Sequence, residues 1–443
     1  MRAADLGAAR VAIWGLGREG RAAIEFLRAR HPRLRLLLLD DSGDASAPTE
    51  LSNIECACGS DAIGHALKHI DVLVKSPGVS LYRPEISLAQ ENGVEVTSLL
   101  NLWFAEGPNI RTVCVTGTKG KSTTASLIAH ILRGLGRKAA LAGNIGVPVT
   151  EIDPSAVEYA VIEVSSYQAA DFDGRCDIAV LTSLFPEHLD WHRTLAAYYR
   201  DKLNVLRRSG AAIVNRDAVP AREFGQYWFN NESGFHVRGG EIFDRRTRIG
   251  FVRNRYLARP HNLSNVCAAL TVAKVLGLDP ATALAATSDF CALPHRQQEI
   301  GEIGGVLYVD DSISTAPEST IAALEVYGGH DITLIVGGYD RGIDYGKLAA
   351  RLAGSTVRMV ICLGVSGERI CAAVRAAGGR PEAALARSMA EAVALARQAT
   401  PAGGVVLLSP AAPSYGYYRD FAERGRDFAA EAGLAGRDGE PPR

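Results

Sequence analysis

The sequence predicts an α/β protein built from three successive domains, each with a mainly parallel sheet. Short apolar runs of strand length alternate with stretches long enough for a helix, which is typical of parallel sheets covered by helices. This alternation restarts twice along the 443 residues, a length beyond what one hydrophobic core serves. We expect the domains to span residues 1–97, 98–297 and 298–443.

Each expected strand is an apolar run bounded by polar, Gly or Pro residues. In the first domain the runs are residues 10–14, 34–40, 72–76 and 94–97. In the second they are residues 111–116, 140–141, 159–164, 178–182 and 211–215. In the third they are residues 306–309, 332–336, 359–363 and 405–408. Segment 216–256 is rich in aromatic and charged residues and predicts an antiparallel excursion, and the polar tail 436–443 is expected to fray.

Composition argues against several classes of protein. The 48 basic and 49 acidic residues leave a formal charge of -1, so no positive excess is available to bind nucleic acid. The apolar runs are well short of the ~20 residues that a membrane span needs. The N-terminus has no apolar signal segment, so we expect a cytoplasmic protein, and we expect a monomer. The eight scattered cysteines predict reduced core thiols.

A glycine-rich turn, Gly15–Gly20, follows the first expected strand and opens a helix. Glycines let the backbone approach an anion, and a helix N-terminus supplies unpaired N–H groups and partial positive charge. Asp40 and Asp41 end the next strand, where a carboxylate can accept from a ribose or a base. This pattern predicts a nucleotide site in a Rossmann-like first domain without identifying the nucleotide. The alternative is tight packing of helix on strand with no ligand.

Segment 113–124 combines a strand, a glycine-rich turn, Lys121-Ser122 and an apolar helix, which is the arrangement of a P-loop. Backbone N–H groups of such a loop wrap phosphate oxygens, the lysine balances phosphate charge and the hydroxyl can bind Mg²⁺. The common spacing places a glycine where Val115 stands. The pattern therefore predicts a P-loop sub-class with fewer glycines.

Polar residues follow several later strands. Glu163 ends the run 159–164 and is the first candidate for a Mg²⁺ ligand, because carboxyl ends of parallel strands meet at the ligand-binding edge. Segment 185–192 supplies two histidines and two carboxylates, whereas Lys202 alone would be a helix-surface cation. In the third domain, polar loops follow three strands and could equally be turns. They are residues 309–312, 337–341 and 408–414.

Taken together, these motifs resemble the Mur ligase family over essentially the whole chain. The motifs that occur in the order of that family are Thr116–Ser122, Glu163–Ser166, Glu187–Asp190, Lys202, His261-Asn262 with Asn265, Leu293–Arg296, Asp311-Ser312 and Gly337-Gly338. Residues 15–20, 409–414 and 421–425 resemble most the members that join glutamate to UDP-N-acetylmuramoyl-L-alanine. The resemblance implies a Rossmann-like UDP-binding domain, a central P-loop domain and a Rossmann-like C-terminal domain.

The resemblance further implies an ATP-dependent, amide-forming ligase of peptidoglycan synthesis, and hence a part in cell wall biogenesis and cell division. The alanine carboxylate would attack the γ-phosphate, and the glutamate amine would open the resulting acyl phosphate. The implied catalytic residues are Lys121, Glu163, His188 and Lys202. The implied Mg²⁺ ligands are Ser122 with Glu163 at one site and His188 with Lys202 at a second, the lysine being carbamylated in relatives.

The resemblance also assigns binding residues by position. The implied ATP contacts are Thr116, Gly117, Thr118, Lys119, Gly120, Lys121, Ser122, Thr123, Asn265, Arg296 and Asp311. The implied substrate contacts are Gly17, Arg18, Glu19, Asp40 and Asp41 for the UDP end, Asn144 and Ser165 for the muramoyl end, and Arg341, Ser414 and Phe421 in the C-terminal domain.

The amino-acid pocket departs from the D-glutamate enzymes. Ile313 stands where they carry a cation, and Arg341 replaces a lysine with a guanidinium that can grip a carboxylate bidentately. This loop, with residues 13–20, resembles the branch that adds L-glutamate, and we expect that amino acid. The closest alternative is the D-glutamate-adding ligase. More remote ones are a nicotinamide dehydrogenase built on Gly15–Gly20 and a nucleotide-binding sensor without turnover.

Overall fold

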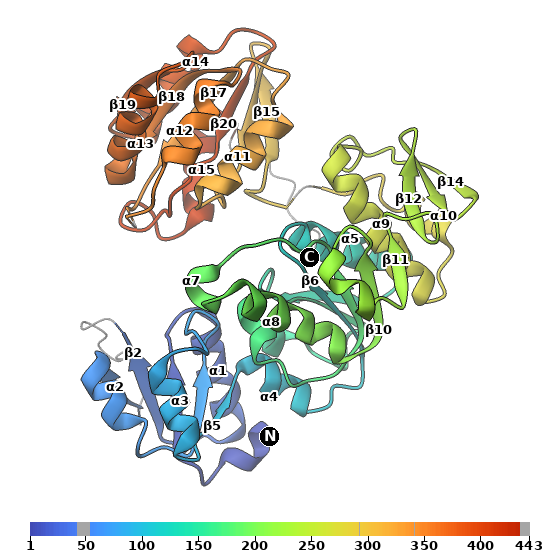
Figure 1. Cartoon of the computed structure of the whole chain (residues 1–443), viewed down its shortest axis with the longest axis vertical. Helices are drawn as coiled ribbons and strands as arrows, with labels where there is room; N and C mark the ends of the chain where they lie inside the picture. The colour runs from blue at the N-terminus through green and yellow to red at the C-terminus, as the bar shows by residue number, and fades with distance from the viewer. Residues whose placement is uncertain (42–53, 292, 341, 435–443) are drawn as a thin grey trace. The chain divides into compact units, whose positions relative to one another are not determined.

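The structure is a computed structural model that describes residues 1–41, 54–291, 293–340 and 342–434. The chain forms two compact units, residues 1–291 and 292–443, which we describe separately. Three sheets lie within these units, two in the first and one in the second (Figure 1). The predicted three-domain α/β fold is confirmed, and the exact domain boundaries stay predictions.

The first sheet has five parallel strands in the order β3-β2-β1-β4-β5. The strand order reverses at β1, and in open α/β sheets ligands bind beyond the carboxyl ends of the strands at such a point. Strand β3 was not predicted, because Ile54–Cys58 is interrupted by Glu55 and is largely outside the core. The elements are η1 (Ala3–Leu6), β1 (Val11–Trp14), α1 (Arg18–Arg30), β2 (Leu36–Asp40), β3 (Ile54–Cys58), α2 (Ser60–Ala66), β4 (Val72–Lys75), α3 (Pro84–Glu91), β5 (Glu95–Thr97) and α4 (Leu99–Ala105).

The second sheet has nine strands in the order β14-β13-β12-β11-β10-β9-β6-β8-β7. The prediction of an antiparallel excursion is correct for β12 to β14 but wrong for β11, which pairs parallel with β10 and with β12. The strands are β6 (Arg111–Thr116), β7 (Ala139–Gly143), β8 (Tyr159–Glu163), β9 (Cys176–Leu181), β10 (Ser209–Asn215), β11 (Tyr227–Phe229), β12 (Phe235–Arg238), β13 (Glu241–Asp244) and β14 (Thr247–Phe251). The helices are α5 (Lys121–Gly134), η2 (Val149–Glu151), α6 (Ser166–Ala170), α7 (Leu189–His192), α8 (Leu195–Arg207), η3 (Val219–Phe224), α9 (Pro260–Val275) and α10 (Pro280–Ala285).

Helices cover both faces of the second sheet, which explains why its central strands are apolar without alternation. On strand β6, Val113 and Val115 pack into the core shared with α5 and α9. Cys114, between them, packs into the opposite core, shared with α4 and α8. Every side chain of this strand interior is therefore buried, and polar groups are confined to the strand end.

The second unit contains the third sheet, with six strands in the order β15-β16-β20-β17-β18-β19. Only β15 is antiparallel to its neighbour, and neither β15 nor β19 was predicted, because both contain charged residues. The strands are β15 (Gln298–Ile303), β16 (Val306–Asp310), β17 (Ile332–Gly337), β18 (Val357–Leu363), β19 (Glu382–Ala386) and β20 (Val405–Leu408). The helices are α11 (Pro317–Val326), α12 (Gly346–Ala353), α13 (Gly364–Ala377), α14 (Met389–Ala399) and α15 (Phe421–Glu431).

All eight cysteines are free thiols. The expectation that they are core thiols is wrong for Cys56 and Cys291, which are exposed because one lies on the sheet-edge strand β3 and the other ends the first unit. Within the described ranges, the helices are all too short or too polar to span a bilayer. The expected fraying of residues 436–443 concerns a tail outside the described residues.

A buried ion pair joins the first two domains. Lys75 ends β4 of the first sheet, and its Nζ lies 3.0 Å from Oδ2 of Asp171, the residue that follows α6. The exposed fractions of the two side chains are 0% and 7%. Burial raises the pKa of the Asp171 carboxyl, and the Lys75 charge opposes that rise. Each charge therefore depends on the other for its compensation.

We expect Lys75→Met to lower the free energy of unfolding at neutral pH by about 3 to 5 kcal/mol, because it strands a buried carboxylate. Urea denaturation followed by circular dichroism measures this loss. Lys75→Met combined with Asp171→Asn removes both charges and should recover most of it. Equal losses in the single and double variants would assign the effect to packing and not to charge.

Candidate functional site

The P-loop connects the end of β6 at Thr116 to the start of α5 at Lys121. Gly117 has a φ of 145°, and a Cβ there would collide with Thr182 Oγ1. Gly120 has a φ of 84°, and a Cβ there would collide with Asn265 Oδ1. Both positions therefore require glycine. The helix that follows is fourteen residues long and points its unpaired N–H groups at the loop, as a phosphate site requires.

Side chains from later segments support this loop. The Lys121 ammonium donates to the Thr118 carbonyl at 3.1 Å, while Lys119 Nζ lies 2.6 Å from Glu187 Oε1. Lys202, on α8, donates to the Gly117 carbonyl at 2.7 Å. All four residues predicted to be catalytic thus lie at or beside the P-loop: Lys121, Glu163, His188 and Lys202. Lys202 is near enough to Lys121 and Glu163, and His188 near enough to Lys121 and Lys202, for an electrostatic influence.

Glu163 ends β8 and is 1% exposed. Its Oε1 accepts a hydrogen bond from the Asn144 side chain at 2.7 Å. Its Oε2 is buried and has no hydrogen-bond partner among the described residues. A buried carboxylate oxygen without a donor is costly, so its position fits contact with a cation.

Lys202 is an unusual lysine because it is 1% exposed. Burial lowers the pKa of its amine well below the ordinary value, and the nearby positive charge of Lys121 lowers it further. His188 has a left-handed backbone with a φ of 56°, and its Nδ1 lies 3.0 Å from the Tyr167 hydroxyl. Burial also lowers the pKa of the His188 imidazole.

Residues predicted to bind the UDP end turn out to contact the second domain as well. Arg18 donates to the carbonyls of Gly143, Asn144 and Gly146 at 3.0 to 3.1 Å. Glu19 accepts a hydrogen bond from Gln168, and burial raises the pKa of its carboxyl to about 7. The two side chains that begin α1 therefore connect the glycine-rich turn to the neighbouring domain.

The remaining predicted residues of the first unit fall at element ends. Gly17 is the N-cap of α1, Asp40 ends β2, and Asp41 pairs with Arg83 at 2.8 Å. Ser165 caps α6 in a reciprocal arrangement with Gln168. Predicted residues also found buried at the P-loop are Thr116, Gly117, Thr118, Ser122, Thr123 and Asn265, the last accepting from Thr124 Oγ1 at 3.1 Å.

In the second unit, Asp311 follows β16 and is 2% exposed. It accepts hydrogen bonds from Ser314 and Ser409, and burial raises the pKa of its carboxyl to about 6. Arg296 is near enough to oppose this rise. The structure thus brings these two predicted ATP contacts together.

A cavity of about 720 Å³ lies beyond the carboxyl ends of β17, β18 and β19. Ser414 lines it together with Gly338, Arg387 and Tyr417. Phe421 does not line this cavity; it begins α15, and its ring centroid lies 6.0 Å from that of His295. Arg341 lies outside the described residues.

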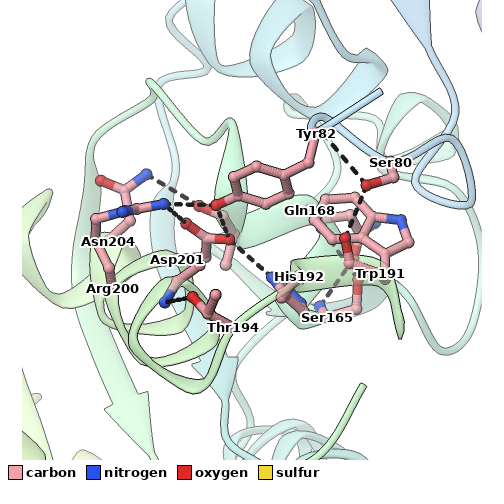
Figure 2. A network of polar contacts seen from close by, with 12 residues as sticks. Ser80, Tyr82, Ser165, Gln168, Trp191, His192, Thr194, Arg200, Asp201 and Asn204 are labelled. Carbon is pink, nitrogen blue, oxygen red and sulfur yellow. Dashed lines mark hydrogen bonds and ion pairs between the residues drawn. The ribbon is translucent and has the colours of Figure 1, made fainter. Parts of the chain in front are cut away.

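Sequence reasoning missed several polar residues around the site. Gln168 stands three residues after Ser165, a capping-box spacing that could have identified it. Tyr82 and Asp201 carry no such local signal. They meet in a network that also includes His192 of α7, the helix that begins after His188, and Asp201 directly precedes Lys202 on α8 (Figure 2).

Comparison with known proteins covers all three domains. Family profiles match the Mur ligase MurD-like N-terminal domain at residues 9–98, the Mur ligase middle domain at 115–273, and the Mur ligase glutamate ligase domain at 295–412. Proteins from Xanthomonas axonopodis pv. citri and Xylella fastidiosa are each 40% identical, over 98% of this chain and 97% of theirs. One from Salinispora tropica is 41% identical, over 97% of this chain and 98% of its own. All three are named UDP-N-acetylmuramoyl-L-alanine–L-glutamate ligase.

Solved structures show the same fold at low identity. UDP-N-acetylmuramate-alanine ligase MurC from Thermotoga maritima aligns with a TM-score of 0.61 and 18% identity, over 95% of this chain and 98% of that one. MurF ligase from the same organism, in complex with ADP, aligns with a TM-score of 0.55 and 15% identity, over 96% and 95%. Matching profiles in all three domains and relatives 40% identical over nearly the full length establish that this chain belongs to the Mur ligase family.

Proposed function

We propose that this chain joins L-glutamate to UDP-N-acetylmuramoyl-L-alanine in the cytoplasm, at the expense of ATP, during peptidoglycan precursor synthesis. The observation that carries the reaction class is the assembly around the P-loop, where Lys121, Glu163 and Lys202 come together. The choice of L-glutamate is supported by the name shared by relatives that align over nearly the full chain.

In this proposal the P-loop backbone and Lys121 hold the β- and γ-phosphates of ATP. An oxygen of the alanine carboxylate attacks the γ-phosphorus, and ADP leaves. The glutamate amine then attacks the acyl carbon, loses a proton and expels phosphate. Positioning and neutralisation of negative charge supply most of the catalysis of such a phosphoryl transfer.

The residues present fit a magnesium ion at the P-loop. Glu163 Oε2 is buried and has no hydrogen-bond donor in the described part of the chain, and Ser122 lies buried at the start of α5. His188 and Lys202 are the proposed ligands of a second ion. Bound magnesium would supply neutralisation of phosphate charge.

Carbamylation would suit Lys202. Only the neutral amine reacts with CO₂, and burial favours that form by lowering the amine pKa. The product carries a carboxylate and releases one proton. The carbamate would add an anionic oxygen ligand of the kind that magnesium prefers.

Substrate contacts are proposed by position. The UDP end would lie against Gly17, Arg18, Glu19, Asp40 and Asp41, and the muramoyl end against Asn144 and Ser165. ATP would also contact Asn265, Arg296 and Asp311, and glutamate would contact Arg341, Ser414 and Phe421. Because Arg18 already binds three carbonyls of residues 143–146, it would act on the UDP end partly by holding that loop. We further propose that the enzyme is monomeric.

We expect phosphate release from ATP and UDP-N-acetylmuramoyl-L-alanine with L-glutamate and little with D-glutamate. Mass spectrometry of the product detects the new amide. Lys121→Ala should lower kcat by about 10² to 10³, because it removes a charge that stabilises the transition state.

Preference for D-glutamate would establish the other glutamate-adding activity. Amide formation with neither enantiomer would reject the ligase proposal and leave a nucleotide sensor. A change in nicotinamide absorbance would instead indicate a dehydrogenase.

We expect Lys202→Ala to lose most activity and to regain part of it with short-chain carboxylic acids, since these can replace the carboxylate of a carbamate. Steady-state kinetics with and without added acetate measure the rescue. The matched control is Lys121→Ala, whose side chain supplies a cation and should not respond to acetate. Absence of rescue in Lys202→Ala would argue against carbamylation.

Glu19 makes stability depend on pH. Its pKa is about 7 in the folded chain and 4.5 without the fold, so the folded state binds more protons between these values. Stability should therefore fall as pH rises from about 4.5 to about 7, with a slope of at most about 1.4 kcal/mol per pH unit. Glu19→Gln should remove this part of the slope in urea denaturation, whereas Glu25→Gln, at an exposed site on the same helix, should retain it.

A further inference from the structure

A buried carboxylate joins three segments beside the P-loop. Asp201 Oδ2 accepts hydrogen bonds from the Tyr82 hydroxyl at 2.6 Å and from His192 Nδ1 at 2.7 Å (Figure 2). Asp201 is 4% exposed and His192 is 0% exposed. Tyr82 belongs to the first domain, His192 to α7 and Asp201 to α8, so one carboxylate fixes all three segments.

The hydrogen bond from Tyr82 to Asp201 is supported by the protonation state of Tyr82 and by a neighbouring arginine. Burial and the hydrogen bond to Asp201 raise the pKa of Tyr82 to about 12, so its hydroxyl remains a donor at neutral pH. Arg200 donates to the Tyr82 oxygen at 2.7 Å and lies 3.5 Å from Asp201 Oδ1. The Asp201 carboxylate therefore has a charged or hydrogen-bonding neighbour at both oxygens.

The same loop of the first domain holds α7 at a second point. Ser80 Oγ donates to the Trp191 carbonyl at 2.8 Å, and Trp191 Nε1 donates to the Pro77 carbonyl at 3.2 Å. The ring of Tyr82 meets that of Trp191 edge-on, with centroids 5.9 Å apart. Backbone and side chain of α7 are thus both bound by residues 77–82.

Helix α7 needs such external support. It has four residues, fewer than an isolated helix requires, and it is flanked by two non-glycine residues with positive φ, His188 at 56° and Arg193 at 68°. Such conformations are costly and persist only where surrounding contacts impose them. His188, one of the proposed catalytic residues, is one of these two strained positions.

The network lies next to Lys202 in the chain. Asp201 immediately precedes Lys202 on α8, and Lys202 reaches the Gly117 carbonyl of the P-loop at 2.7 Å. A shift of α8 at Asp201 would displace the Lys202 amine from that position. Tyr82 of the first domain is therefore connected to the P-loop through Asp201 and its neighbour Lys202.

We propose that Tyr82, Asp201 and His192 are positioning residues that hold His188 and Lys202 at the P-loop, so that docking of the first domain completes the catalytic geometry. This inference rests on the proposed function, because it assigns His188 and Lys202 to catalysis. It predicts that removing the Tyr82 hydroxyl slows the chemical step, although Tyr82 is remote in sequence from the P-loop. The binding of ATP and of the UDP-linked substrate should not weaken.

The test is Tyr82→Phe, which keeps the ring and removes only the hydroxyl. We expect kcat to fall about tenfold, as for loss of one hydrogen bond to a charged group. The KM values for ATP and for UDP-N-acetylmuramoyl-L-alanine should stay within about twofold. The matched control is Tyr199→Phe, because Tyr199 lies half-buried on the same α8 helix, while the side-chain partners of Asp201 among the described residues are Tyr82, His192 and Arg200. Its kcat should be unchanged.

Two further measurements separate positioning from general destabilisation. Asp201→Ala combined with Tyr82→Phe should be no slower than Asp201→Ala alone, because Asp201→Ala already removes the acceptor of the Tyr82 hydroxyl. Hydrogen exchange of residues 189–207 should accelerate in Tyr82→Phe and not in Tyr199→Phe, while the thermal midpoint stays within a few degrees.

Several outcomes would overturn the inference. An unchanged kcat with wild-type hydrogen exchange would reject a positioning role. A selective rise in KM for UDP-N-acetylmuramoyl-L-alanine would make Tyr82 a substrate contact instead. Additive losses in the double variant would show that the two residues act independently. If the wild-type chain forms no amide, the proposed function fails, and hydrogen exchange still decides whether Tyr82 holds the segment.

Discussion

The contact between Lys202 and the P-loop is the constraint on which the site depends. An ammonium or amine with 1% exposure has lost its water, and its hydrogen bond to the Gly117 carbonyl replaces part of that hydration. Gly117 accepts this bond because its backbone adopts a φ of 145°, which its missing side chain permits. Glu163 is near enough to act electrostatically on Lys202, and its Oε2 has no hydrogen-bond donor in the part of the chain that the structure describes. The loop conformation, the buried lysine and this carboxylate therefore form one arrangement. The glycines allow the backbone conformation of the loop, and the hydrogen bond from Lys202 holds the Gly117 carbonyl in position.

Charged and polar groups also connect the first domain to the second, although apolar contacts there would avoid the cost of desolvating charges. A buried pair such as Lys75 and Asp171 contributes little net stability, because both charges are desolvated. It penalises misplacement strongly, however, since a displaced partner leaves an uncompensated charge. The Arg18 contacts with residues 143–146 and the Tyr82 contact with Asp201 act in the same direction. Together they favour one docking geometry of the first domain over many similar ones.

Sequence patterns predicted the parts of this protein that are set locally. The P-loop and Glu163 were identifiable because a strand end, a glycine turn and a helix start are adjacent in the chain. Tyr82 and Asp201 were not, because their meeting depends on how two sheets dock, and 118 intervening residues carry no pattern for it. Strand β11 was misassigned for a related reason: η3 (Val219–Phe224) returns the chain to parallel pairing, and its short 3₁₀ turn lacks the periodicity of a crossover helix. Local sequence patterns therefore identify the P-loop and Glu163, whereas the residues that position them depend on tertiary contacts.

The C-terminal motif Phe421–Gly425, which resembles the family pattern, has a structural role in the second unit. Arg424 is 3% exposed, and its guanidinium donates to Ser312 and to the carbonyls of Gly337 and Ala412. Gly337 ends β17, whereas Ser312 and Ala412 lie in the loops after β16 and β20. Gly425 is required because a Cβ there would collide with the hydrogen-bonded pair of His295 and Asp310. The motif therefore holds together the loops that surround the proposed amino-acid site. Handedness of glutamate depends on three contact directions at its α-carbon, and a shift of any of these loops changes those directions. Under the proposed function, the loop arrangement that Arg424 fixes would contribute to selectivity for one enantiomer, together with the residues that touch the amino acid.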